Sequence, residues 1–128
     1  MNEKILIIDD EKDVCEVVKD ILDYEGFDVK IANTGDQAME HLKKGIYQLL
    51  LVDVRLEGSM NGIDVIKACR ALPGKPKIAV ISATTASELE PIFRNEGISS
   101  IISRILEKPR DLEPSKFTKI IKELIETK

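Results

Sequence analysis

At 128 residues the chain has the length of one ordinary domain and can bury a substantial core. Hydrophobic residues make up 43% and charged residues 33%, as is typical of a soluble globular protein. The net charge of −4, without a basic stripe, argues against direct nucleic-acid binding, and the apolar runs are too short to span a membrane. We therefore expect a single cytoplasmic domain over residues 1–128 that has no signal peptide.

Short apolar runs with polar or turn boundaries predict the strands of a parallel sheet. Residues 4–8, 48–52 and 77–81 are apolar almost throughout, which is typical of central strands covered on both faces. Residues 28–32 contain a shorter apolar stretch in which apolar and polar residues partly alternate, so they predict an edge strand. A fifth strand lies within residues 98–106, and the pattern leaves its limits open.

A helical pattern follows the first predicted strand. Apolar residues there repeat with the spacing of one buried helix face, and Gly26 can end the helix. The residues of this predicted face are Val14, Val17, Val18, Ile21 and Leu22.

Four further helices are predicted in the segments after the other strands. They cover residues 36–44, residues 63–72, a stretch from Ser87 or Glu90 to Asn95, and a last helix from near Pro114. In the fourth helix, Ser87 and Glu90 could form a capping box. Strand and helix thus alternate five times, which predicts an α/β fold.

The connections are long enough for right-handed crossovers between parallel strands. We expect a flavodoxin-like, doubly wound, five-stranded parallel sheet of order 2-1-3-4-5, with helices on both faces. In such a sheet ligands bind beyond the carboxyl ends of the strands, where the strand order reverses.

Polar residues stand at each of these predicted strand ends. Asp9 and Asp10 close the first strand, and Asp53 closes the third, which is its neighbour in the expected order. Ser82 closes the fourth strand, and Lys108 follows the fifth. All five should therefore lie along one edge of the sheet.

Carboxylates held close together are costly, because like charges disfavour joint ionisation. A cluster of them without His or Cys suits a hard, oxygen-loving cation, and Mg²⁺ is the cofactor we expect. A carboxylate can also attack phosphorus and carry a phosphoryl group, for which Lys108 supplies a cation and Ser82 a hydroxyl donor. The set therefore predicts a phosphate-accepting site on Asp53.

Each motif taken alone has a simpler explanation. Asp9-Asp10-Glu11 could cap the first helix, Ser82 could be a satisfied strand-end hydroxyl, and Lys108 could be a loop residue. The combination along one sheet edge favours the functional interpretation. By contrast, Cys15, Cys69 and His41 have no partners at metal-binding spacing, so we expect two core cysteines and a surface helix histidine.

Four motifs, taken as a set, resemble the receiver domain of two-component response regulators over essentially the whole chain. They are Ile7-Ile8-Asp9-Asp10-Glu11, the run from Leu50 to Leu56 around Asp53, Ile81-Ser82-Ala83, and Lys108-Pro109.

The resemblance implies a role for each matching acid. Asp53 corresponds to the phosphoacceptor. Asp10, Asp53 and the main-chain carbonyl of Arg55 would bind Mg²⁺ directly, and Asp9 would act through water. Among the other residues, Lys108 would pair with the phosphoryl group, Ser82 would turn towards it as the switch, and the Lys108–Pro109 peptide is expected to be cis.

The resemblance also implies partners. A histidine kinase or a histidine phosphotransfer protein would donate the phosphoryl group, and a downstream protein target would receive the signal. The domain would be a regulatory phosphoacceptor and not an enzyme, with intrinsic self-phosphorylation and self-dephosphorylation. Formation of a homodimer is compatible with this role.

The chain departs from the family pattern after Asp53. Family members usually have Leu-Pro followed by a Gly, whereas Leu56 here is followed by residues 57–61 and then Gly62, without the proline and with one residue more. We expect this change to affect loop mobility and dephosphorylation and to leave the acid cluster intact.

A second departure affects the fifth strand, where the family usually has a Tyr or Phe that moves with the switch hydroxyl. That position falls on Ile101 when counted from Gly97 and on Ile105 when counted back from Lys108. The segment between Gly97 and Lys108 is also longer than usual, so we expect altered output or dimerisation through this face.

Two other functions share part of this pattern. A haloacid-dehalogenase-like phosphohydrolase also phosphorylates an Asp at a strand end, but it needs a second Asp two residues later, where this chain has Arg55. A degenerate receiver could serve as a phosphate-independent binding scaffold. The complete set of acids with Ser82 and Lys108 argues against it, while the missing aromatic residue keeps it open.

Overall fold

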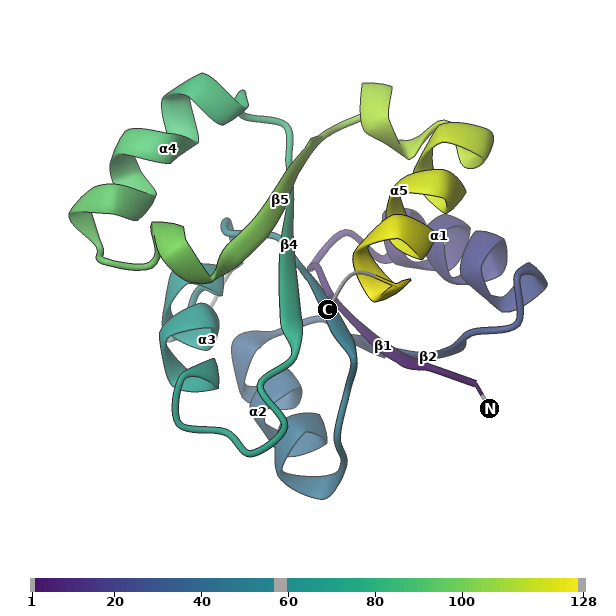
Figure 1. Cartoon of the computed structure of the whole chain (residues 1–128), viewed down its shortest axis with the longest axis horizontal. Helices are drawn as coiled ribbons and strands as arrows, with labels where there is room; N and C mark the ends of the chain where they lie inside the picture. Colours follow the sequence, from purple (N-terminus) through teal and green to yellow (C-terminus); the bar gives the residue numbers. More distant parts are fainter. Residues whose placement is uncertain (1, 57–59, 127–128) are drawn as a thin grey trace.

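The computed structural model of the chain describes residues 2–56 and 60–126. It contains a parallel sheet of five strands in the order β2-β1-β3-β4-β5, between two layers of helices (Figure 1). The strands are β1 (Lys4–Ile8), β2 (Asp28–Ala32), β3 (Leu49–Val52), β4 (Lys77–Ser82) and β5 (Ile102–Glu107). The predicted flavodoxin-like fold and strand order are confirmed.

Helices cover the two faces of the sheet unequally. On one face lie α1 (Lys12–Tyr24) and α5 (Pro114–Glu126), and on the other lie α2 (Gly35–Lys44), α3 (Gly62–Cys69) and α4 (Ala86–Asn95) (Figure 1). Two short 3-10 turns, η1 (Ser99–Ile101) and η2 (Arg110–Leu112), flank β5.

The central strand β1 shows why apolar runs predicted the sheet so well. Leu6 and Ile8 pack against the α2–α3–α4 layer, while Ile5 and Ile7 pack against α1 and α5. Successive side chains of a strand point to opposite faces, so a strand covered on both sides must be apolar at every position. All four of these residues are fully buried.

One residue of the predicted face of α1 lies outside the core. Val17 is 58% exposed, whereas Cys15, Val18 and Leu22 are buried. The buried stripe therefore follows the 3.6-residue period through Cys15, Val18 and Leu22, and Val17 lies outside it. The prediction for Val17 was wrong, because an apolar residue at a helical spacing does not itself show which side of the stripe the sheet covers.

The predicted capping box in α4 is also absent. The helix begins at Ala86 after Thr85, and its first turn has no side-chain cap from Thr85. Ser87 Oγ instead lies 3.2 Å from Thr85 Oγ1. The Ala86 N–H is satisfied from another element, by the carboxylate of Glu107 at 3.1 Å.

The structure also resolves two boundaries that the sequence left open or placed differently. Helix α3 ends at Cys69, and the following residues to Leu72 continue as tight turns with bonds three residues apart, so the predicted helix was too long. The stretch before β5 contains η1, and the strand starts only at Ile102.

The long segment before Lys108 therefore has a structural explanation. Its first part forms the turn Ser99–Ile101, and the pairing of β5 with β4 then shifts: Ile78 pairs with Ile102, but Ala79 pairs with Arg104. Ser103 is the extra residue of this bulge. Beyond it the register is regular, so Ser82 pairs with Glu107 directly before Lys108.

Cys15 and Cys69 are buried, free thiols, as expected for core residues. His41 lies partly exposed on α2. Among the described helices, none combines the length and the apolar content that crossing a membrane requires. The unusual loop at residues 57–59 lies outside the described residues.

Candidate functional site

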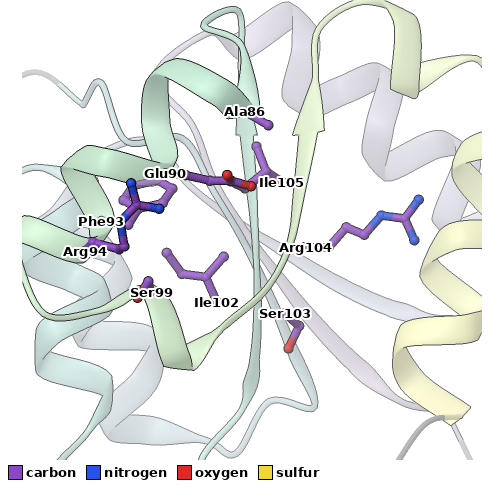
Figure 2. A pocket seen from close by; sticks show the side chains of 9 residues that line it. All are labelled: Ala86, Glu90, Phe93, Arg94, Ser99, Ile102, Ser103, Arg104 and Ile105. Atoms are coloured by element: carbon purple, nitrogen blue, oxygen red, sulfur yellow. The ribbon is translucent and has the colours of Figure 1, made fainter.

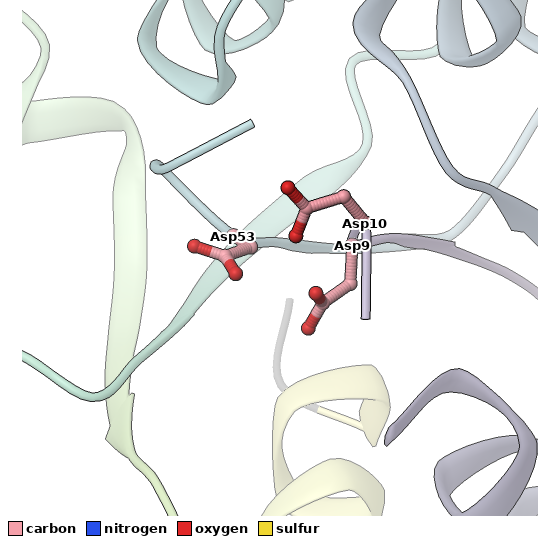
Figure 3. A group of neighbouring side chains, drawn as sticks. All are labelled: Asp9, Asp10 and Asp53. Carbon is pink, nitrogen blue, oxygen red and sulfur yellow. The ribbon is translucent and has the colours of Figure 1, made fainter. Parts of the chain in front are cut away.

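Three carboxylates meet at the carboxyl edge of the sheet. Ile8 pairs with Val52 in the parallel ladder, and the Asp53 N–H donates to the Ile8 carbonyl at 2.8 Å, so the residues following β1 and β3 are neighbours. Asp9, Asp10 and Asp53 each present a carboxylate oxygen within 4.8 Å of the other two (Figure 3). The structure thus brings together the acids that the strand-end pattern singled out.

Lys108 reaches the same cluster from the end of β5. Its Nζ donates to Asp9 Oδ2 at 2.8 Å and lies 3.3 Å from Asp53 Oδ2. It also lies 3.4 Å from Glu11 Oε1, whose side chain is 59% exposed. Since the side chains of Lys108, Asp9 and Asp53 are at most 10% exposed, water screens these charges weakly.

Burial and the neighbouring charges act in opposite directions on the ionisation of Asp9 and Lys108. Burial raises the pKa of the Asp9 carboxyl, and hydrogen bonds from Lys108 and the Glu11 N–H offset only part of this rise. Burial would lower the pKa of Lys108, but Asp9 and Asp53 outweigh it and raise that pKa. We take Lys108 as charged, because its Nζ contacts both acids, and the cluster remains net negative.

The donor atoms available to a metal ion are carboxylate oxygens. Both Asp9 oxygens already accept hydrogen bonds, Oδ2 from Lys108 Nζ and Oδ1 from the Glu11 N–H at 2.9 Å. The Asp10 side chain is partly exposed and accepts no hydrogen bond from the described part of the chain. An all-oxygen, net negative site with one unengaged carboxylate fits Mg²⁺ well.

Local backbone contacts fix the Asp53 side chain. Its Oδ1 accepts a hydrogen bond from the Arg55 N–H at 2.9 Å, which leaves Oδ2 with the longer contact to Lys108. The turn after Asp53 packs tightly against the start of α3. A Cβ on Gly62 would lie 2.3 Å from the Asp53 carbonyl oxygen, so only glycine permits this approach.

Ser82 is buried at the end of β4, beside the cluster and turned into its own loop. Its Oγ accepts from the Thr84 N–H at 3.0 Å, and its carbonyl accepts from the Lys108 N–H at 2.8 Å. The predicted cis peptide between Lys108 and Pro109 is present. The main chain of Ser82 is therefore hydrogen-bonded to the main chain of Lys108, while the Ser82 hydroxyl makes no hydrogen bond to Asp53.

Three contacts around the site were not predicted from the sequence. The Arg55 side chain donates from Nη2 to Thr84 Oγ1 at 2.6 Å, Glu107 accepts from the Ala86 N–H, and Glu11 approaches Lys108. Glu107 and Glu11 adjoin predicted site residues in the sequence, which is the one signal that could have pointed to them. The distance in sequence between Arg55 and Thr84 gives no such signal.

The position of the expected aromatic residue is occupied by Ile105. It lies on β5 with regular pairing to Val80, whereas Ile101 lies in the turn before the strand. Figure 2 shows Ile105 on the α4 side of β5, near Glu90, and Arg104 on the opposite side. Ile105 and Phe93 line a cavity of about 470 Å³ between α4 and β5. An aliphatic side chain therefore occupies this position, and it faces α4.

Comparisons with known proteins agree with this geometry. A profile of the response regulator receiver domain matches residues 5–121. The transcriptional regulatory protein CpxR of Escherichia coli (strain K12) is 38% identical over 90 residues, which are 70% of this chain and 37% of CpxR. The DNA-binding response regulator MtrA of Mycobacterium leprae (strain TN) is 38% identical over 112 residues, or 88% of this chain and 48% of MtrA. The chain thus spans less than half the length of these curated relatives.

Solved structures show the same fold. A CheY-like response regulator receiver domain protein from Methanospirillum hungatei JF-1 superposes with a TM-score of 0.82 and 26% identity, covering 98% of this chain and 94% of that one. Chemotaxis response regulator CheY4 of Vibrio cholerae gives a TM-score of 0.83 at 22% identity, with 97% and 99% coverage. The chain belongs to the response regulator receiver domain family of two-component systems, in which aspartate phosphorylation and Mg²⁺ binding are general features.

Proposed function

We propose that Asp53 accepts a phosphoryl group from a phosphohistidine, with Mg²⁺ bound beside it. The observation that supports this most strongly is the convergence of Asp9, Asp10, Asp53 and Lys108, which come from three strand ends that are far apart in sequence. Membership of the receiver family supports the same reaction. The phosphodonor would be a histidine kinase or a histidine phosphotransfer protein.

Each acid has a distinct part in this proposal. Asp10 and Asp53, with the main-chain carbonyl of Arg55, would bind Mg²⁺ directly, while Asp9 would bind it through water. The engagement of both Asp9 oxygens supports its indirect role, and the unengaged Asp10 carboxylate supports direct binding. When bound, Mg²⁺ supplies positive charge to the phosphoryl oxygens.

In the transfer step, an Asp53 carboxylate oxygen attacks phosphorus as the P–N bond to the donor imidazole breaks. The imidazole leaves with the electron pair of that bond, and the phosphoryl group stays on Asp53 as an acyl phosphate. Oδ2 is the better placed oxygen, because Oδ1 is held by the Arg55 N–H. Lys108 then pairs with the phosphoryl oxygens, since its Nζ already lies 3.3 Å from Asp53.

We infer that Ser82 acts as the switch. To donate to a phosphoryl group on Asp53, its hydroxyl would turn from the Thr84 N–H, from which Oγ accepts at 3.0 Å. That exchange would move the loop between β4 and α4, and with it the start of α4. The cavity beside Ile105 lies under the same helix, so a downstream protein target that binds there would respond to the movement of α4.

This domain would act as one unit over residues 1–128, as a regulator with intrinsic self-phosphorylation and self-dephosphorylation and not as an enzyme. Direct contact with nucleic acid is not expected from a chain with a net charge of −4. Formation of a homodimer and a cytoplasmic location remain predictions from the sequence.

Phosphorylation can be tested by intact-mass measurement after incubation with Mg²⁺ and a small phosphodonor. We expect one phosphoryl adduct on the unaltered protein, none on Asp53→Ala, and an unchanged adduct on Asp20→Ala, which removes an exposed acid of α1. An adduct that persists in Asp53→Ala would place the acceptor elsewhere. Absence of any adduct on the unaltered protein would favour the binding-scaffold alternative.

A further inference from the structure

A cavity of about 470 Å³ lies at the opposite end of β4 from Ser82. It is bordered by the end of α3 and the following turn, the first residues of β4, and the entry into β5. Its volume falls within the range of small-molecule sites in proteins. The lining residues are Cys69, Arg70, Lys75, Pro76, Lys77, Ile78, Ile101 and Ser103.

One wall of this cavity consists of the extra residues before β5. Ile101 belongs to the turn η1, and Ser103 is the bulged residue between the pairs Ile78–Ile102 and Ala79–Arg104. Bulges of this kind redirect side chains locally. The longer segment between Gly97 and Lys108 thus forms part of a cavity. The proposed phosphotransfer does not use these extra residues.

Cationic side chains border the cavity, in a chain whose net charge is −4. Its lining includes Arg70, Lys75 and Lys77, and no lining residue is acidic. Arg70 donates to the Gly97 carbonyl, which orients its guanidinium without neutralising it. The Lys77 ammonium is turned towards α5 on the other face of the sheet, where it donates to the Leu124 carbonyl. A guanidinium has five donors and an ammonium three, so donors remain for a ligand.

Lys75 is distinct in its backbone as well as its charge. Its φ of 35° lies in the left-handed region, which non-glycine residues seldom adopt. The side chain makes no ion pair within residues 2–56 and 60–126. It therefore offers the cavity an ammonium group without a counter-charge.

The interior between these cations is apolar. Ile78 and Cys69 are almost fully buried, and Ile101 packs against the same core cluster. We propose that this cavity binds a small amphipathic anion, with an apolar chain or ring against Ile78 and Ile101 and a carboxylate or phosphate group beside Arg70 and Lys75. Charge complementarity selects this class over neutral or cationic ligands. The proposal is independent of phosphotransfer at Asp53.

The test is an amide chemical-shift titration of the full chain with four probes that share one alkyl chain: octanoate, octyl phosphate, octanol and octylammonium. We expect both anions to shift the amides of Ile78, Ile101 and Ser103 saturably, and the neutral and cationic probes to bind at least about tenfold more weakly. The tighter of the two anions then identifies a carboxylate or a phosphate as the preferred group.

Two charge-reversal variants complete the test. Lys75→Glu should weaken binding of the anions about tenfold. Lys30→Glu makes the same change of net charge on the exposed part of β2, at the far edge of the sheet, and should leave binding unaltered. Equal binding of octanol or octylammonium, an equal effect of the two variants, shifts elsewhere in the chain, or no shift with either anion would each overturn the proposal.

Discussion

The carboxylate of Glu107 accepts a hydrogen bond from the Ala86 N–H at 3.1 Å and so joins the end of β5 to the start of α4. Glu107 directly precedes Lys108, and Ala86 follows the loop that starts at Ser82. A carboxylate at a helix N-terminus also interacts favourably with the helix dipole. This contact therefore couples the strand that presents Lys108 to the helix that we expect to move.

Glu107→Ala should loosen the start of α4. Loss of the cap should lower the free energy of unfolding by about 1 kcal/mol, within the range of N-terminal caps. Faster amide hydrogen exchange at residues 86–89 should accompany it, and Glu40→Ala, on the exposed side of α2, should change neither quantity. Unchanged exchange in Glu107→Ala would show that the bond does not hold the helix in solution.

Lys108→Ala should destabilise the domain and leave Mg²⁺ binding in place. Removing the ammonium leaves Asp9 and Asp53 without their buried counter-charge, which should cost about 3 kcal/mol of stability in chelator. Mg²⁺ should still bind and restore part of that loss, because the carboxylates remain. Urea unfolding with and without Mg²⁺ measures both effects, with Lys12→Ala as the exposed control. Loss of Mg²⁺ affinity in Lys108→Ala would contradict the role assigned to it.

Gly62→Ala should be poorly tolerated. The added Cβ would lie 2.3 Å from the Asp53 carbonyl oxygen and 2.6 Å from Val54 Cα, so the backbone beside the phosphoacceptor must shift. We expect a loss of at least about 2 kcal/mol in the free energy of unfolding and a lower yield of phosphorylated protein. At Gly45 the nearest atoms would be 3.8 Å away, and Gly45→Ala should fold normally. Equal stability of the two variants would show that the close approach at Gly62 relaxes at little cost.

Both cysteines should be unreactive in the folded protein. Burial raises the pKa of Cys15 and of Cys69 to about 11, so the reactive thiolate is scarce at pH 8, and each residue is at most 4% exposed. A coloured thiol reagent should titrate both groups rapidly in urea and neither of them without denaturant. Rapid reaction in the native state would indicate local opening of α1 or α3.

Asp111 should contribute to stability at neutral pH. Burial alone would raise its pKa, but hydrogen bonds from Arg110, Lys116 and the Glu107 N–H outweigh burial and lower it. The stabilisation is therefore complete above the unfolded-state pKa of about 4, and is lost as the pH falls towards the lower folded-state pKa. Asp111→Asn should lose about 1–2 kcal/mol at pH 7 and show a smaller decline in acid. Parallel pH profiles for the two proteins would contradict this.

The sheet was predictable because each central strand is covered on both faces and must be apolar at every position. The apolar run Ile5, Leu6, Ile7 and Ile8 meets this condition and can be recognised in the sequence without knowledge of any distant contact. The strand-end acids followed from the topology, since parallel strands bring their carboxyl ends to one edge. Secondary-structure pattern and strand order thus accounted for most of the site.

What the sequence could not predict depends on packing between distant segments. Val17 fits a helical spacing, yet the position of α1 on the sheet leaves it in solvent. The cap of α4 comes from Glu107 on another strand, so the local Ser87–Glu90 pattern was misleading. The turn and bulge before β5 depend on pairing with β4, for which local propensity gives no signal.

The parallel arrangement of the strands has an evolutionary consequence. The groups proposed to react follow strands that are held by the innermost packing of the molecule, whereas the outer faces of the helices take no part in the proposed reaction. Substitutions on those outer faces can change which protein is recognised while the chemistry at the sheet edge stays constant. A lineage can in this way multiply separate signalling routes from one reactive centre.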